Sequence, residues 1–142
     1  MRLISSPESE RTREGLVHVL VVDDHSAFRR VARALIEATD GFRAVGDAAS
    51  GAEALRLADE LRPDLVLMDV CMPDMDGFEA ARELTHAHPE CVVVLVSLDD
   101  LDDLSELVAA SGAVAFVRKD ELTPSLLYDL WTLRGTRPPN ES

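Results

Sequence analysis

Residues 65–77 read LVLMDVCMPDMDG, and this stretch decides the fold more than any other part of the chain. It begins with four apolar residues and continues through Asp69 into a segment rich in Pro, Asp and Gly. A short apolar run that ends in turn residues is typical of a strand buried on both faces of a parallel sheet. An aspartate directly after such a strand lies at the carboxyl edge of the sheet, where open α/β folds bind ligands. We therefore expect an α/β fold with a polar site at Asp69.

Segments on both sides of this stretch extend the pattern. Further predicted strands occupy residues 17–22, 43–48, 92–96 and 115–117, and those at 17–22 and 92–96 are almost continuously apolar. Apolar residues recur at helical spacing between them, in one stripe of Phe28, Val31, Ala32, Leu35 and Ile36, another of Leu101, Leu104, Leu107 and Val108, and a third of Leu126, Leu127, Leu130 and Leu133. Ser50 followed by Glu53, and Thr123 before Pro124, mark helix starts. Right-handed crossovers then give a doubly wound, five-stranded parallel sheet with five helices.

The composition predicts one domain with polar ends. The chain has 142 residues and is 46% hydrophobic, which is enough apolar material for one core. Residues 1–15 and 135–142 are rich in Ser, Glu, Arg, Pro and Gly, so we expect a disordered N-terminal tail and a flexible C-terminal tail around a domain at 16–134. The fifth helix is followed by too few residues for an output domain, so we expect output through a separate protein.

Charge and cysteine content narrow the possible partners and compartment. A formal net charge of −13 argues against direct binding to nucleic acid or an anionic membrane, because both depend on clustered Lys and Arg. No apolar run approaches the roughly 20 residues that cross a bilayer, and the N-terminus has no signal-peptide core. Cys71 and Cys91 have no metal-binding spacing and are predicted to be free thiols. These features favour a cytoplasmic protein in a reducing compartment.

Polar residues that suit phosphate chemistry follow four of the predicted strands. They are Asp23 and Asp24 after the first strand, Asp69 after the third, Ser97 after the fourth and Lys119 after the fifth. Gathered carboxylates repel one another by about 4 kcal/mol per pair at 4 Å and an effective dielectric near 20, so they favour a divalent cation. Oxygen ligands suit Mg²⁺, with Asp24 and Asp69 as candidate direct ligands and Asp23 acting through water.

The same residues are sufficient for phosphoryl transfer to a carboxylate. Asp69 is the candidate nucleophile, because an aspartate can form an aspartyl phosphate once the negative charges are offset. Lys119 supplies a positive charge, and Ser97 supplies a hydroxyl for a phosphoryl oxygen. Such transfer depends mainly on alignment and charge stabilisation and requires no general base.

Four segments together resemble the receiver domain of two-component response regulators. They are VVDD at 21–24, LVLMDVCMPDMDG at 65–77, VVLVS at 93–97 and GAVAFVRKD at 112–120, and the similarity runs from about Val17 to Leu133. The resemblance implies a flavodoxin-like fold with strand order 2-1-3-4-5. It identifies Asp69 as the phosphoacceptor, Asp23 and Asp24 as the acidic pair, Ser97 as the switch hydroxyl, Lys119 as the phosphate-binding lysine, Phe116 as the aromatic switch residue and the Cys71 carbonyl as the third metal ligand.

The resemblance also predicts how such a protein works. A sensor histidine kinase or phosphotransfer protein donates the phosphoryl group, and an unknown downstream protein, with a possible homodimer, reads the altered surface. The protein is then a phosphoacceptor that catalyses only its own phosphorylation and dephosphorylation. Asp120 follows Lys119 where many members have proline, as in receivers that usually precede a helix-turn-helix domain. Leu98 stands where a small residue is common.

Other interpretations remain open beside this one. Leu98 favours a receiver-fold interaction module that works without phosphorylation. A haloacid-dehalogenase-like phosphatase would need a second aspartate where Cys71 stands, so we discount that interpretation. Three of the four histidines, His25, His86 and His88, are predicted not to be metal ligands, because a turn or helix end explains each of them. An acidic run from Asp99 to Glu106 is explained as helix-start chemistry, and Trp131 as a residue at the flank of the core.

Overall fold

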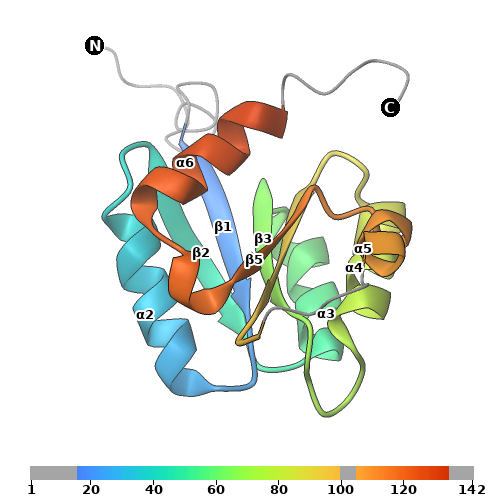
Figure 1. Cartoon of the computed structure of the whole chain (residues 1–142). Helices are drawn as coiled ribbons and strands as arrows, with labels where there is room; N and C mark the ends of the chain where they lie inside the picture. The colour runs from blue at the N-terminus through green and yellow to red at the C-terminus, as the bar shows by residue number, and fades with distance from the viewer. Residues whose placement is uncertain (1–15, 100–104, 135–142) are drawn as a thin grey trace.

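The computed structural model describes residues 16–99 and 105–134, and these residues form one α/β layer structure (Figure 1). The five strands are β1 (Val17–Val22), β2 (Phe42–Ala48), β3 (Leu65–Asp69), β4 (Val92–Ser97) and β5 (Ala115–Arg118). All of their pairings are parallel, and their order in the sheet is β2-β1-β3-β4-β5. The predicted fold class and strand order are confirmed. The expected tails at 1–15 and 135–142 lie outside the described residues.

Five α-helices within the described residues cover both faces of the sheet. They are α2 (Ser26–Glu37), α3 (Gly51–Leu61), α4 (Gly77–Ala87), α5 (Ser105–Ser111) and α6 (Pro124–Leu133), and a short 3₁₀ helix, η1 (Lys119–Glu121), follows β5. Helices α2 and α6 pack on one face, and α3, α4 and α5 pack on the other (Figure 1). None of the described helices is long and apolar enough to cross a bilayer.

The core has two halves, one on each face of the sheet, because the strands carry apolar side chains on both faces. Every residue of β3 and β4 is buried, as expected for central strands of a parallel sheet. Successive residues of β1 alternate between the two halves, with Val19 and Val21 facing α2 and α6 and Leu20 and Val22 facing α3 and α4. The predicted strand limits differ from the observed limits by at most one residue.

The helix patterns were predicted less well than the strands. Val31 is 60% exposed, and Leu107 and Leu133 are also exposed, although each belongs to a predicted apolar stripe. In α2, the small Ala32 and the large Ile36 fill the contact with the sheet, which leaves Val31 on the solvent flank. Trp131 packs against the core, as expected.

Helix ends follow the predicted caps. Ser50 Oγ accepts the N–H of Glu53 at 3.2 Å, and Thr123 Oγ1 accepts the N–H of Leu126 at 3.1 Å. The predicted helix-start role of the acidic run can be followed only for its described residues. Helix α5 begins at Ser105 with Glu106 in its first turn, and Asp99 precedes it, whereas residues 100–104, with Leu101 and Leu104 of the predicted stripe, lie outside the described part.

Candidate functional site

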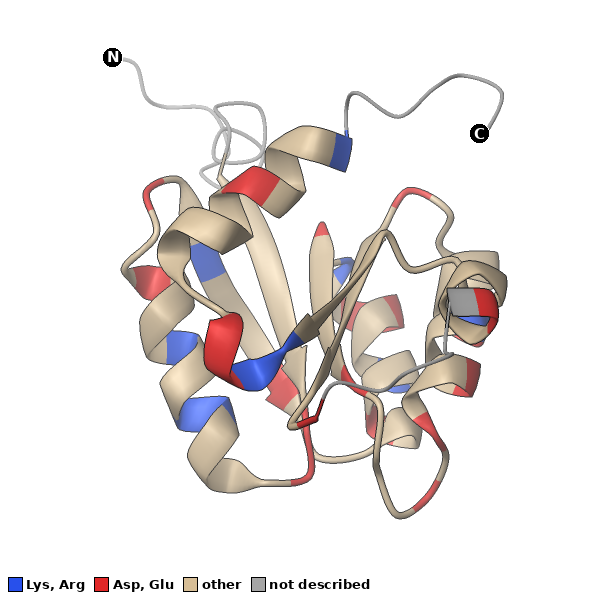
Figure 2. Cartoon of the chain, viewed as in Figure 1, with Lys and Arg blue, Asp and Glu red and all other residues tan. Residues whose placement is uncertain are grey.

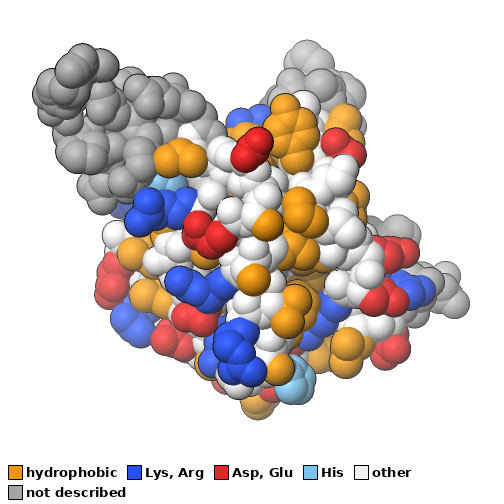
Figure 3. Space-filling model, turned by 90° about the vertical axis from the view of Figure 1, so that its left-hand side faces the viewer, with side chains coloured by type: hydrophobic (Ala, Val, Ile, Leu, Met, Phe, Trp, Pro, Cys, Tyr) orange, Lys and Arg blue, Asp and Glu red, His pale blue; other side chains and the backbone are white. Residues whose placement is uncertain are grey.

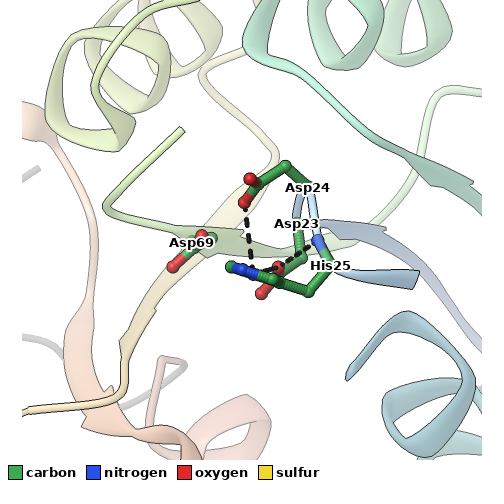
Figure 4. A group of neighbouring side chains, drawn as sticks. All are labelled: Asp23, Asp24, His25 and Asp69. Atoms are coloured by element: carbon green, nitrogen blue, oxygen red, sulfur yellow. Dashed lines mark hydrogen bonds and ion pairs between the residues drawn. The ribbon is translucent and has the colours of Figure 1, made fainter. Parts of the chain in front are cut away.

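Three carboxylates meet at the carboxyl edge of the sheet. Asp23 and Asp24 follow β1, and Asp69 ends the neighbouring strand β3, whose Met68 is paired with Val22. Asp23, Asp24, His25 and Asp69 each offer one ligand atom, and these atoms all lie within 4.8 Å of one another (Figure 4). The predicted convergence of the acidic residues is therefore observed. We call these four residues the acidic site.

Lys119 reaches the acidic site from the end of β5. Its Nζ atom lies 2.6 Å from Asp23 Oδ2 and 3.6 Å from Asp69 Oδ1, and its side chain is only 7% exposed. The ring of Phe28, on the first turns of α2, lies below the ammonium group with its centroid 4.6 Å from Nζ. Sequence analysis predicted the position of Lys119 but not the role of Phe28, because an apolar residue at helical spacing looks like an ordinary core residue.

The three carboxylates and one ammonium group leave the acidic site with an excess of negative charge. Asp69 is 3% exposed, and its pKa is raised from 3.8 to about 6. Burial is the main cause of this rise and the charge of Asp23 adds to it, whereas Lys119 and the backbone N–H of Cys71 act in the opposite direction. Lys119 therefore offsets only part of the repulsion.

The donor atoms of this site fit Mg²⁺. Carboxylate oxygens are the ligands that this ion prefers, and one or two of them commonly bind it together with waters. Asp24 Oδ1 is buried and accepts no hydrogen bond from the described residues, which leaves it available to a cation. Which oxygens bind directly, and whether the Cys71 carbonyl contributes, stay predictions.

The segment after Asp69 is fixed to two helices. Gly77 begins α4 and donates its N–H to the Val70 carbonyl at 2.9 Å, and a side chain at this position would collide with the backbone oxygen of Asp69. The Asp74 carboxylate accepts the N–H groups of Gly51 and Ala52, at 3.1 and 3.0 Å, at the start of α3. Asp74 was missed by sequence analysis because its partners lie far away in the chain.

The two predicted switch residues lie on different strands: Ser97 is on β4, which neighbours β3 and Asp69, and Phe116 is on β5 beyond β4. Ser97 ends β4, is buried and accepts the N–H of Asp99 at 3.2 Å through its Oγ. It follows Val96, the residue paired with Asp69. Phe116 lies on β5 and packs, partly buried, against the half of the core that faces α4 and α5. Their switching roles stay predictions.

His25 occupies a place that its sequence context did not suggest. Its Nδ1 lies 3.1 Å from Asp23 Oδ1 and 3.3 Å from Asp24 Oδ1, so the ring lies against both acidic residues (Figure 4). His86 and His88 lie at the end of α4, as expected. His88 follows its last turn and places Nε2 2.7 Å from Asp59 Oδ1 on α3, whereas His86 belongs to the last turn itself.

An apolar hollow opens next to the acidic site. Its volume is about 420 Å³, and its lining includes Phe28 and Val31 of α2, Leu98 after β4, and Lys119. Figure 3 shows the α2 side of the molecule, where apolar side chains are exposed between charged ones. Leu98 is 70% exposed at this hollow. The bulky residue after the predicted switch serine therefore faces solvent beside the site.

Two further features of the sequence, its excess of acidic residues and its two cysteines, can be followed in the structure. Acidic positions are spread over most elements and outnumber basic ones (Figure 2), in keeping with 27 Asp and Glu against 14 Lys and Arg. Cys71 is exposed and Cys91 is buried, and both are free thiols. Burial raises the pKa of Cys91 to about 12, so this cysteine remains a neutral thiol.

Comparison with known proteins gives one consistent family. The model of the response regulator receiver domain matches residues 19–130. Response regulator GacA of Pseudomonas viridiflava is 41% identical over 104 residues, which are 73% of this chain and 49% of that protein. Transcriptional regulatory protein YdfI of Bacillus subtilis is 37% identical over 112 residues, which are 79% of this chain and 52% of that protein. The chain thus spans about half the length of these relatives.

Solved structures support the same assignment. The receiver domain of the putative response regulator NarL from Mycobacterium tuberculosis superimposes with a TM-score of 0.76 at 30% identity, covering 85% of this chain and 98% of that one. The response regulator domain of Thermotoga maritima CheB gives a TM-score of 0.74 at 29% identity, with 87% and 99% coverage. The matched family model covers more than half of the chain. This chain therefore belongs to the response regulator receiver domain family.

Proposed function

We propose that the chain is a phosphorylation switch that accepts a phosphoryl group on Asp69 from a sensor histidine kinase or a phosphotransfer protein. Phosphorylation would change the surface that a downstream protein recognises. The observation that carries the proposal is the buried Asp69 carboxylate, with Lys119 Nζ 3.6 Å from it and the acidic pair beside it. Membership of the receiver family supports the same role.

The proposed transfer uses few groups. An oxygen of Asp69 forms a bond to phosphorus while the bond between phosphorus and the donor's imidazole nitrogen breaks, and the imidazole leaves with the bonding electrons. The pKa of about 6 leaves most of Asp69 ionised near pH 7, as a nucleophile requires. Lys119 lies where it can offset charge on the incoming group. Bound Mg²⁺ would neutralise phosphoryl oxygens and complete its shell with one of them.

The signal would follow from the added charge. A phosphoryl group brings about −1.5 to −2 charge, which shifts a two-state equilibrium of the surrounding loops and helices. In this proposal, the Ser97 hydroxyl turns to a phosphoryl oxygen and Phe116 packs further inward. The aspartyl phosphate would then hydrolyse slowly in the same site, so that the protein's only chemistry is its own phosphorylation and dephosphorylation.

The partners in this proposal are proteins. The net charge of −13 disfavours direct contact with nucleic acid or anionic lipid, and the cytoplasm is the expected compartment. Association of two copies through the altered surface is one form that the output can take.

Intact mass spectrometry tests the proposal. The wild type and Asp69→Asn are incubated with acetyl phosphate, each with Mg²⁺ or with a chelator. We expect one phosphoryl group on the wild type only with Mg²⁺ and none on Asp69→Asn. Asp76→Asn, a change at an exposed residue of the same loop, serves as the control that should still be modified.

A second function is favoured by the exposed Leu98 beside the site. In this alternative, the chain binds a partner through the receiver surface without being phosphorylated. If the wild type remains unmodified by acetyl phosphate and also by a panel of phosphorylated kinases, the alternative becomes the better account. A mass gain that persists in Asp69→Asn would place the phosphoryl group elsewhere and contradict the proposed phosphoacceptor.

A further inference from the structure

His25 stands out among the groups that the proposed function does not use. Its imidazole nitrogen lies at the acidic site, whereas the proposed switch needs only oxygen donors, Lys119 and Ser97. We propose that His25 is an additional metal donor, which lets the acidic site bind a transition-metal ion such as Ni²⁺ or Zn²⁺ in competition with Mg²⁺. The inference rests on the proposed function, because it assigns a cation to the same carboxylates.

The spacing of the donor atoms supports this proposal. Ligands about 2.1 Å from one ion at right angles are about 3.0 Å apart. Nδ1 of His25 lies 3.1 Å from Asp23 Oδ1 and 3.3 Å from Asp24 Oδ1, close to that separation. An oxygen of Asp69 completes the set within 4.8 Å. A small shift of the side chains would bring all four donors to one ion.

The local backbone holds the histidine in this place. The N–H of His25 donates to Asp23 Oδ1 at 2.8 Å, which fixes the turn between β1 and α2. The His25 side chain is 64% exposed, so the ring forms the solvent side of a site whose Asp23 and Asp69 are buried. An ion can therefore enter from solvent past the imidazole, and Asp24 Oδ1 accepts no hydrogen bond within the described part of the chain that would compete for it.

The chemistry of the two ion classes makes the proposal specific. Mg²⁺ prefers oxygen ligands and gains little from imidazole, whereas Ni²⁺, Cu²⁺ and Zn²⁺ bind imidazole well. Transition-metal ions also bind carboxylates more tightly than Mg²⁺ does, so total affinity alone does not identify the donor. The donor is identified instead by how much the removal of the imidazole changes the affinity for each ion.

The contacts of His25 have one competing explanation. The ring can donate a hydrogen bond from Nδ1 to Asp23 Oδ1, at 3.1 Å, and only orient the neighbouring carboxylates. Such an orienting role would affect every cation in the same direction. A donor role would affect the transition-metal ions and leave Mg²⁺ nearly unchanged.

Calorimetric titration of the metal-free full chain with NiCl₂ and with MgCl₂ separates these roles. The proteins are the wild type, His25→Ala and, as a matched control for an exposed imidazole elsewhere, His86→Ala. We expect His25→Ala to weaken Ni²⁺ binding by roughly tenfold or more and to change Mg²⁺ binding by less than about twofold. His86→Ala should change neither. Nitrogen coupling in the electron paramagnetic resonance spectrum of bound Cu²⁺ should be present in the wild type and lost in His25→Ala.

Three outcomes would overturn the proposal. Equal weakening of Ni²⁺ and Mg²⁺ in His25→Ala would make His25 an orienting residue only. Unchanged Ni²⁺ affinity, or a loss in His86→Ala instead, would place the ion away from His25. The proposed function is judged separately, from Mg²⁺-dependent modification of the wild type by acetyl phosphate, so the two ideas can fail independently.

Discussion

At the scale of single residues, Asp69 links function to stability. Its pKa rises from 3.8 to about 6 on folding, so the folded state holds the proton more tightly than the unfolded chain does. The stability that this proton contributes is complete below pH 3.8 and is lost as the pH rises through about 6. Ionised Asp69 thus costs the metal-free protein of order 3 kcal/mol at neutral pH.

Asp69→Asn removes this ionisation and keeps the shape of the side chain. We expect the variant to be more stable than the wild type at pH 8, by up to about 3 kcal/mol, and the difference to shrink toward pH 4. Urea denaturation in chelator at several pH values measures it. Asp129→Asn, on the exposed surface of α6, is the control that should show no such trend. A difference that stays constant between pH 4 and pH 8 would contradict the electrostatic explanation.

Lys119 and Phe28 form a cation–π pair that stabilises the position of the lysine. The ammonium group is nearly buried over the aromatic ring, and a desolvated cation–π contact contributes about 2 kcal/mol. A double-mutant cycle with Phe28→Leu and Lys119→Met should give a coupling energy of about 1 to 2 kcal/mol in urea denaturation. Phe28→Tyr keeps the ring and should retain most of that coupling. If Phe28→Leu and Lys119→Met are additive, the ring does not position the lysine.

The meeting of polar side chains at the sheet edge is predictable from the sequence where strand ends define it, and less so elsewhere. Asp69 and Ser97 are the last residues of their strands and Lys119 directly follows β5, and parallel strands bring their carboxyl ends to one edge. Phe28 and His25 depend on side-chain rotamers and on how α2 is placed, which an apolar stripe and a turn do not specify. Their contacts therefore required coordinates.

At the scale of elements, Asp74 joins the loop after Asp69 to the start of α3. The N–H groups of Ala52 and Gly51 lower the pKa of Asp74 below its ordinary value by stabilising the carboxylate. A group with a lowered pKa contributes stability above its ordinary pKa and loses it as the pH falls through its folded value. This link is also electrostatically suited to a helix N-terminus.

Asp74→Ala tests this connection. We expect it to lower the free energy of unfolding by about 1 kcal/mol at pH 7, a loss of the size seen when a side chain that accepts N–H groups at a helix start is removed, and by less in acid. Faster hydrogen exchange at the amides of Gly51 and Ala52 should accompany the loss. Asp74→Asn keeps one acceptor oxygen, so its free energy of unfolding should lie between those of the wild type and Asp74→Ala. Unchanged exchange at both amides would show that the carboxylate does not hold the helix start in solution.

The strands were easier to predict than the helix faces for a physical reason. A central strand of a parallel sheet is buried on both sides, so an apolar run such as that of β4 has one interpretation. A helix buries only part of its apolar stripe. Val31 and Leu107 lie at the edges of such stripes, and only the packing of neighbouring elements determines whether they are covered.

At the scale of the whole molecule, the negative charge has two effects. It opposes folding through self-repulsion, and at the acidic site it favours binding of Mg²⁺. The net charge of −13 produces self-repulsion that salt screens, so NaCl should raise stability gradually. Binding of Mg²⁺ at the acidic site would add to this screening. An ion at ten times its Kd stabilises the folded state by about 1.4 kcal/mol when it binds only that state.

Denaturation in MgCl₂ and in NaCl at equal ionic strength separates the two effects. The wild type should be more stable in MgCl₂, and the added stability should rise with Mg²⁺ concentration as binding saturates. Asp24→Asn should lose this increment and keep the response to NaCl, because one carboxylate among 27 acidic residues scarcely changes the general repulsion. If MgCl₂ and NaCl stabilise the wild type equally, the acidic site has no specific affinity for a divalent ion. The pattern of buried carboxylates would then require another explanation than the proposed switch.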